Sequence, residues 1–133
     1  MKACYAAILF CIVFFSSCKK PAGEGGNSSI RGKVWVKQWD KYYTQIVYQY
    51  FGSDVDVYII YGDDISYSDK TSTNYNGEFE FKYLRKGNYK VYAFSTEKQD
   101  TINPSGTTTT LVQTKISKNK QTVDIGTLEV KQR

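Results

Sequence analysis

The sequence predicts an all-β protein with one β-sandwich domain over residues 30–133, and three observations support this fold class. Segment 71–94 alternates apolar with charged or polar residues, which is the period of a half-buried strand. The alternation is interrupted by Asn76-Gly77 and by Lys86-Gly87-Asn88, which are turn signals between strands. If Asn76-Gly77 forms a type I′ hairpin turn, both residues need a positive φ. The rest of the domain shows short extended segments and no helical periodicity.

Residues 1–17 are predicted to be a signal peptide. Lys2 supplies the positive charge, and the apolar run over 3–15 is too short to cross a membrane as a helix. The run ends in Phe15-Ser16-Ser17-Cys18, which resembles the lipobox of bacterial lipoproteins, although Phe15 stands where leucine is usual. An ordinary secretory signal and a buried strand are the alternatives for this stretch.

The cysteines support a lipoprotein. All three lie in this leader, at positions 4, 11 and 18, so only Cys18 would remain after cleavage. The resemblance implies that Cys18 is lipidated and that the protein is anchored in the bacterial cell envelope, in the outer membrane. The membrane is then one partner of the chain. An exported domain without a cysteine pair is no disulfide scaffold and must fold on its core alone.

Residues 18–29 are predicted to be the lipidated cysteine followed by a flexible tether, because they are rich in Gly, Ser and Asn and have no periodicity. Lys19 and Lys20 would lie beside the lipid, where they either meet anionic head groups or are simply solvated. The net charge of +5 is spread along the chain without a nucleic-acid-binding motif, so we expect no nucleic-acid partner.

The first strand is expected at 30–37, with Trp35 on its polar face between lysines. Residues 38–52 are rich in aromatic residues of high β-propensity. We expect them to form a hairpin insertion that turns near Asp40-Lys41, pairs back on the first strand and covers Trp35. Further strands are expected at 54–61, 65–73, 78–84, 89–94, 107–116 and 122–130. Lys70 indicates that strand 65–73 lies at a sheet edge, and Gly126 indicates a bulge in strand 122–130.

The order Asn-x-x-Gly-x-Phe-x-Phe-x-x-Leu-x-x-Gly-x-Tyr-x-Val resembles the signature of carboxypeptidase regulatory-like domains and their collagen-adhesin B-type relatives. The resemblance implies a seven-stranded, transthyretin-like (prealbumin-like, Ig-like) β-sandwich, to which the aromatic hairpin would be an insertion after the first strand. Most of the matching positions are turn and core residues, so the motif identifies a fold rather than a chemistry. They are Asn74, Gly77, Phe79, Phe81, Leu84, Gly87, Tyr89 and Val91.

The composition argues against catalysis. The chain has no histidine, which excludes His-dependent triads, His-ligated zinc and imidazole bases. It also separates the chain from the transthyretin-related hydrolases, whose sites depend on histidines. No cysteine nucleophile remains in the domain, and no carboxylate pair stands out. We therefore expect no enzyme activity, no catalytic residue and no cofactor.

Some collagen-adhesin B-type domains form an internal Lys–Asn isopeptide bond. Lys33 or Lys37 lies in the appropriate first strand, but the last strand offers no asparagine, and Asn119 lies in the preceding turn. We therefore expect these lysines to be surface residues.

A calcium site is a second possibility in the sequence. Asp63, Asp64 and Asp69 are the candidate ligands, because Ca²⁺ prefers several oxygen ligands and carboxylates at loop spacing supply them. The spacing of an EF-hand is missing, and aspartates after Gly62 are ordinary turn residues. We expect a solvated turn and no metal.

Two functions remain open. The first is a non-catalytic envelope lipoprotein whose sandwich serves protein–protein interaction or scaffolding. The alternative is a carbohydrate-binding module that uses the aromatic arm, Trp35–Phe51, because exposed Trp and Tyr bind proteins or sugar rings. The arm either packs upon itself or binds a ligand. In the second case we expect Trp39 and Tyr43 to be the ligand-binding residues and to stay partly exposed.

Overall fold

The computed structural model describes residues 20–133, and all of its regular secondary structure is β-strand. The expected signal peptide and Cys18 lie outside these residues. None of the described residues belongs to a helix that could cross a bilayer. The strands are β1 (Glu24–Trp39), β2 (Ile46–Phe51), β3 (Asp56–Tyr61), β4 (Asp69–Ser72), β5 (Glu78–Leu84), β6 (Gly87–Thr96), β7 (Thr107–Ile116) and β8 (Thr122–Gln132).

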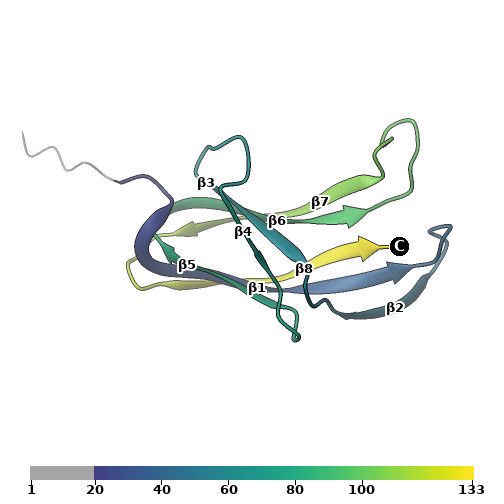
Figure 1. Cartoon of the computed structure of the whole chain (residues 1–133). Helices are drawn as coiled ribbons and strands as arrows, with labels where there is room; N and C mark the ends of the chain where they lie inside the picture. The colour runs from purple at the N-terminus through teal and green to yellow at the C-terminus, as the bar shows by residue number, and fades with distance from the viewer. Residues whose placement is uncertain (1–19) are drawn as a thin grey trace, which may run out of the picture.

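The strands form two sheets that lie face to face in an elongated molecule (Figure 1). In sheet 1, β1 is the central strand: its first half pairs with β5 and its second half with β2, both antiparallel, while β8 runs parallel along its other side. Sheet 2 is antiparallel in the order β4-β3-β6-β7. The all-β, two-sheet architecture and the edge position of Lys70 on β4 are as predicted.

The core lies between the two sheets and follows the alternation in the sequence. Phe79, Phe81 and Tyr89 are buried, as predicted, and Tyr61 is half-buried with its ring 5.8 Å from that of Tyr89. The other buried apolar residues are Ile30, Val34, Val36, Val57, Ile59, Leu84, Val91, Ala93, Ile116, Leu128 and Val130.

The N-terminal segment is more ordered than the sequence indicates. β1 begins at Glu24, so residues 24–29 lie in sheet 1, and the expectation of a flexible tether is wrong for them. The small residues are needed for packing: a Cβ on Gly26 would lie 2.0 Å from the carbonyl oxygen of Leu84. Arg85 holds residues 21–23 in place. Its backbone N–H donates to the carbonyl oxygen of Gly23, and its Nε donates to the carbonyl oxygen of Pro21 at 2.8 Å.

The turn at Asn74–Gly77 connects the two sheets instead of closing a hairpin. β4 belongs to sheet 2 and β5 to sheet 1, so the predicted pairing of these neighbouring strands is wrong. The type I′ turn is also wrong, since of Asn76 and Gly77 only the glycine has a positive φ, 73°. The Asn74 carboxamide oxygen accepts the backbone N–H groups of Asn76 and Glu78 and holds the turn. Turn residues mark a reversal of the chain, but not which sheet the next strand enters.

The predicted bulge at Gly126 is confirmed. Asp124 pairs with Arg31, and Thr127 pairs with Lys33, so two residues of β8 lie opposite one residue of β1. Gly126 has a φ of 78°, and its N–H donates to the Asp124 carboxylate at 2.9 Å. The bulge lets β8 follow β1 to the far end of the molecule.

Candidate functional site

The candidate site begins with the β1–β2 hairpin, which forms as predicted, with Lys37 opposite Gln49 and Trp39 opposite Ile46. Its turn is organised by the Asp40 carboxylate, which accepts the backbone N–H and the hydroxyl of Thr44, each at 2.6 Å. The hydroxyl of Thr44, and then the backbone N–H groups, hold the pKa of Asp40 below its usual value despite some opposing desolvation. The ionised Asp40 therefore preorganises the turn.

Tyr43 has an unusual backbone in this turn. Its φ is 55°, in the left-handed region that favours glycine, and its N–H donates to the Asp40 carbonyl oxygen at 3.1 Å. A residue other than glycine in this region costs on the order of 1–3 kcal/mol and is commonest at functional sites. The Arg133 guanidinium lies 5.7 Å from the centre of the Tyr43 ring, within cation–π distance.

Trp39 and Tyr43 line one cavity of about 270 Å³ at the end of the sandwich. Both are half-buried, so each is partly exposed as predicted. Across the cavity lie charged side chains from the loop after β6 and from β8, where the Lys131 ammonium is 3.1 Å from the Glu97 carboxylate. The remaining charged lining residues are Lys98 and Asp100. The cavity therefore combines two aromatic rings with two carboxylates and two ammonium groups.

The indole N–H of Trp39 is screened from solvent and has no hydrogen-bond acceptor among the described residues. A buried donor without a partner costs about 1–3 kcal/mol, so such groups are rare in folded proteins. Trp39 is the only residue with such a side-chain atom in the described part of the chain. Trp39 thus carries a hydrogen-bonding group that no other described residue uses.

The loop that faces Trp39 and Tyr43 is held by its own hydrogen bonds. The Asp100 carboxylate accepts the backbone N–H groups of Ile102 and Asn103, at 2.8 and 2.7 Å. These bonds lower the pKa of Asp100, and the bond from Asn103 has the largest effect. Sequence analysis missed the charged half of the cavity, since residues 97–100 have the composition of an ordinary polar loop.

The rest of the arm packs partly upon itself. The ring of Phe51 meets that of Trp35 edge to face, with centroids 4.7 Å apart, and the Trp35 indole N–H donates to Gln49 at 3.1 Å. The expectation that the arm covers Trp35 is therefore confirmed. Tyr48 and Tyr50 stack on each other, 5.7 Å apart, and stay exposed.

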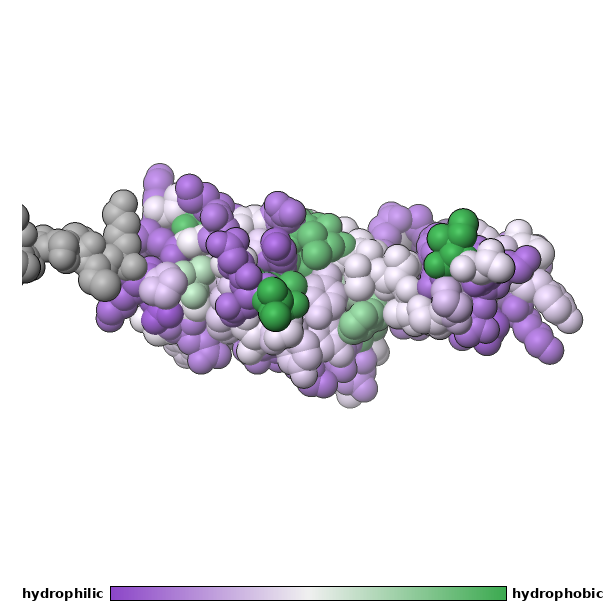
Figure 2. Space-filling model, turned by 90° about the horizontal axis from the view of Figure 1, so that it is seen from above, coloured by the Kyte–Doolittle hydropathy of each residue, from purple (hydrophilic) through white to green (hydrophobic). Residues whose placement is uncertain are grey.

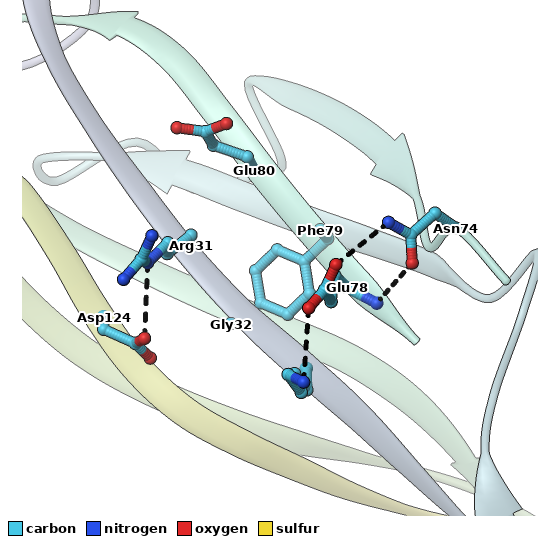
Figure 3. Close-up of a pocket in the computed structure, with 8 residues that line it drawn as sticks. Arg31, Gly32, Asn74, Glu78, Phe79, Glu80 and Asp124 are labelled. Carbon is cyan, nitrogen blue, oxygen red and sulfur yellow. Dashed lines mark hydrogen bonds and ion pairs between the residues drawn. The ribbon is translucent and has the colours of Figure 1, made fainter. Parts of the chain in front are cut away.

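A larger cavity, of about 420 Å³, lies at sheet 1 and is shown in Figure 3. Arg31 pairs with Asp124 at 3.3 Å, and Glu78 binds both Lys33 and the Asn74 carboxamide, at 3.2 Å each. The pKa of Glu78 is lowered most by the hydrogen bond from Asn74, and next by the bond and charge of Lys33. Because these charges satisfy one another, the cavity presents fewer unused polar groups than the Trp39–Tyr43 cavity.

The outer face of sheet 2 carries further aromatic rings. Tyr58 stacks on Tyr92 at 5.2 Å and meets Tyr67 and Phe94 edge to face at 5.1 and 5.2 Å. Figure 2 shows this side of the molecule, where apolar side chains are separated by polar and pale ones. The rings contact each other, and Tyr58 and Phe94 also line an open depression of about 520 Å³.

The calcium candidates do not form a cluster. Asp64 accepts the Ser68 hydroxyl at 3.0 Å, and Asp69 accepts the Lys70 backbone N–H at 2.8 Å. Residues 20–133 contain no group of three or more acidic, His or Cys side chains placed to hold a metal ion.

The isopeptide lysines form ion pairs at the surface. Lys33 pairs with Glu78 at 3.2 Å, and Lys37 pairs with Glu129. Asn119, the asparagine considered for the cross-link, lies in the turn before β8 and lines a different cavity.

Comparison with known proteins gives the fold only. No family model matches the sequence, and no curated protein matches it. Among solved structures, the fold is similar to that of a Pseudomonas aeruginosa protein described as a "putative carbohydrate binding protein". The TM-score is 0.51 with 15% sequence identity, over 81% of this chain and 91% of that one.

Proposed function

We propose that this protein binds carbohydrate in the Trp39–Tyr43 cavity. The observation that carries the proposal is that these two partly exposed aromatic rings share one cavity with four charged side chains. Ligand sites typically combine aromatic walls with a few polar groups that fix orientation. The description of the Pseudomonas protein of similar fold as a carbohydrate binder agrees with this assignment.

The chemistry of the lining suits a sugar. An indole or phenol ring presents a flat apolar face to the C–H face of a pyranose at little entropic cost. Glu97 and Asp100 accept hydrogen bonds from hydroxyl groups, and Lys98 and Lys131 donate to ring or hydroxyl oxygens. The small volume suits one sugar unit, and the cavity is open to solvent, so a longer chain extends outside it.

The site is proposed to bind without hydrolysing. A glycosidase needs a carboxylic acid whose pKa is raised so that it protonates the leaving group. The backbone N–H bonds to Asp100 lower its pKa instead, and Glu97 forms an ion pair with Lys131. Asp100 is thus suited to accept hydrogen bonds rather than to donate a proton, and Glu97 is already engaged by Lys131.

We also propose that the protein is a lipoprotein of the bacterial cell envelope, anchored in the outer membrane through Cys18. The apolar run over 3–15 followed by Ser16-Ser17-Cys18 supports this assignment. The anchor would hold the carbohydrate site at the cell envelope, where polysaccharides are abundant.

A second candidate function is protein binding along β2. All six residues of this strand are exposed, and among the described residues it pairs only with β1. An unpaired edge with apolar side chains is the surface to which another strand adds. The exposed apolar residues of β2 are Ile46, Val47, Tyr48, Tyr50 and Phe51.

We further propose that the domain is a transthyretin-like sandwich of the carboxypeptidase regulatory-like type. The signature from Asn74 to Val91 supports the family. Removing β2, the returning strand of the inserted hairpin, leaves seven strands.

The deciding experiment is a glycan array followed by calorimetric titration with the best ligand. We expect binding that Trp39→Ala reduces at least tenfold. Tyr42→Ala is the matched control, because Tyr42 lies in the same turn, is 70% exposed and does not line the cavity. Absence of any glycan ligand, or equal loss in both variants, would contradict carbohydrate binding in this cavity. Capture of a protein partner that a β2 variant such as Tyr48→Lys abolishes would favour the second candidate.

A further inference from the structure

A wide basic cleft, of about 900 Å³, lies at the end of the sandwich where the described chain begins. Its walls are the glycine-rich start of β1, the β5–β6 turn, the end of β7 and the turn before β8. Its charged lining residues are Lys20, Arg85, Lys86 and Lys115, and no acidic residue of the described chain lines it. Figure 2 shows mainly hydrophilic side chains at this end of the molecule.

The turn between β7 and β8 adds two more cations beside the cleft. Ser28 donates its hydroxyl to the Lys118 carbonyl oxygen, and the Lys120 backbone N–H donates to Asn27, so both lysines lie next to the start of β1. Both are exposed, as are Lys20, Lys86 and Lys115, while Arg85 is half-buried.

None of these six cations forms an ion pair with another described residue. Within residues 20–133, the ion pairs involve other basic residues, on the outside of sheet 1, on β4 and at the far end of β8. The same end of the molecule carries the acidic residues Glu24, Asp63 and Asp64, so the basic residues exceed them by six to three. The excess positive charge is exposed and available to an external anionic partner.

The short sequence between Cys18 and Pro21 keeps this cleft near the expected lipid anchor. Arg85 Nε holds the carbonyl oxygen of Pro21 at 2.8 Å, which ties Pro21 to the cleft. Pro21 is the third residue after Cys18, and three extended residues span at most about 11 Å. If Cys18 carries lipid, the basic cleft lies close to the head groups, at a distance comparable to the Debye length of about 8 Å at physiological salt.

We propose that this basic end of the sandwich docks on an anionic membrane surface and binds the phosphate groups of lipid head groups. The docking acts together with the lipid: the acyl chains hold the protein at the bilayer, and the cations set its orientation. The docking surface is distinct from the carbohydrate cavity, which lies at the other end of β1 (Figure 1). The docked protein therefore presents the Trp39–Tyr43 cavity away from the membrane.

The first test uses the mature chain, residues 18–133, with Cys18→Ala, so that no lipid contributes. It is sedimented with vesicles of phosphatidylcholine, alone or mixed with phosphatidylglycerol. We expect binding only to the anionic vesicles, weakening as salt is added. Replacing Lys86 and Lys115 by Gln should lower the partition coefficient about fivefold per lysine, on the order of thirtyfold together. The matched control replaces Lys41 and Lys90, which lie outside the cleft, and should leave binding nearly unchanged.

Three outcomes would overturn the proposal: equal binding to neutral vesicles, equal loss in the control variant, and no loss in the Lys86/Lys115 variant. Competition by glycerol 3-phosphate at the same phosphate concentration would also overturn it, because the cleft would then bind a soluble phosphate ester. None of these measurements involves a sugar, so their failure leaves the carbohydrate proposal intact.

A second test addresses orientation in the lipidated protein reconstituted into anionic vesicles. A water-soluble amine reagent should label Lys41 and Lys98 much faster than Lys86 and Lys115. Without vesicles, in detergent, the four lysines should react at similar rates, because all four are exposed. Equal labelling in the vesicles would contradict docking of the basic end.

Discussion

The hydroxyl of Tyr89 accepts a hydrogen bond from the backbone N–H of Gly23 at 2.9 Å, across 66 residues of sequence. The same hydroxyl donates to the carbonyl oxygen of Arg85 at 2.6 Å. Tyr89 is 1% exposed, and its ring belongs to the core. One phenol thus joins the beginning of the chain, the β5–β6 turn and the interior of the sandwich.

Tyr89→Phe should therefore loosen the N-terminal segment selectively. The ring stays in the core, but a buried N–H and a carbonyl oxygen lose their partner, which costs about 1–3 kcal/mol of unfolding free energy. Chemical denaturation measures the cost, and hydrogen exchange should rise most at residues 22–26. Tyr83→Phe, at an exposed position, is the control. Unchanged exchange at residues 22–26 would show that Tyr89 does not hold the segment.

Tyr43→Gly should stabilise the protein while it weakens carbohydrate binding. Glycine adopts the φ of 55° without strain, so the unfolding free energy should rise by about 1 kcal/mol. The ring that lines the cavity is lost, so affinity should fall at least tenfold. The measurements are a thermal melt and a sugar titration of the same preparation. A loss of stability would show instead that the Tyr43 ring serves packing.

Tyr61→Phe should make the protein more resistant to alkaline unfolding. Burial, followed by the charges of Glu24 and Asp69, raises the pKa of Tyr61 from 10.0 to about 12. The contribution of Tyr61 to the unfolding free energy is fully present below pH 10. It is lost as the pH rises from about 10 through about 12, because in this range the unfolded chain loses the Tyr61 proton and the folded chain keeps it. Tyr61→Phe removes this contribution. Burial also raises the pKa of Tyr89 and Tyr92, so part of the alkaline decline should remain.

The readout is the unfolding free energy between pH 9 and 12 in denaturant titrations. The variant should show a shallower decline than the wild type. Tyr75→Phe, at a position that is 96% exposed, should follow the wild type. Identical slopes for Tyr61→Phe and the wild type would contradict the assignment of the high pKa to Tyr61.

Gly77→Val should destabilise the fold by more than about 2 kcal/mol. The residue has a φ of 73°, and a Cβ there would lie 2.9 Å from the Phe51 Cβ and 3.0 Å from the Val34 carbonyl oxygen. Val34 donates its N–H to the carbonyl oxygen of Gly77, so a shift of this turn also disturbs β1. Asn76→Val is the control, since Asn76 lies beside Gly77 without a positive φ. Equal melting temperatures for the two variants would disprove the steric argument.

Cys18→Ala should release the protein from the membrane fraction and abolish metabolic labelling with palmitate. Stable anchoring needs more than one acyl chain, and a lipoprotein cysteine carries several. Cell fractionation checks the result. The control is Ser17→Ala, which keeps a small residue before the cysteine and should remain in the membrane fraction. Unlabelled wild-type protein cleaved at another position would contradict lipidation.

Most of the fold could be predicted because its signals are local. Alternation located the buried residues of β3 and β5, and Gly126 revealed the bulge in β8. The crossing at Asn74–Gly77 was missed because a turn signal is the same whether the next strand joins the same sheet or the opposite one. The start of β1 was missed because glycines needed for close packing, such as Gly26, have the composition of a linker.

The candidate site could be predicted only in part. The aromatic arm exceeded the needs of a sandwich core, which pointed to Trp39 and Tyr43. Their charged neighbours, such as Asp100 and Lys131, come from a distant loop and from the last strand. No sequence pattern connects these segments, because the contact exists only once β1, β6 and β8 are assembled at one end.

β1 also determines how the protein would bear mechanical load. This single strand runs from Glu24 to Trp39, about 50 Å at ~3.3 Å per residue. A pull on a sugar held at Trp39 would therefore travel to the anchor along one continuous covalent backbone. Nine residue pairs join β1 to its parallel neighbour β8. Tension along the strands therefore loads the hydrogen bonds of all these pairs at the same time, instead of breaking them one after another. If the cavity binds sugar and Cys18 carries lipid, as proposed, the fold would stay intact while the sugar is pulled.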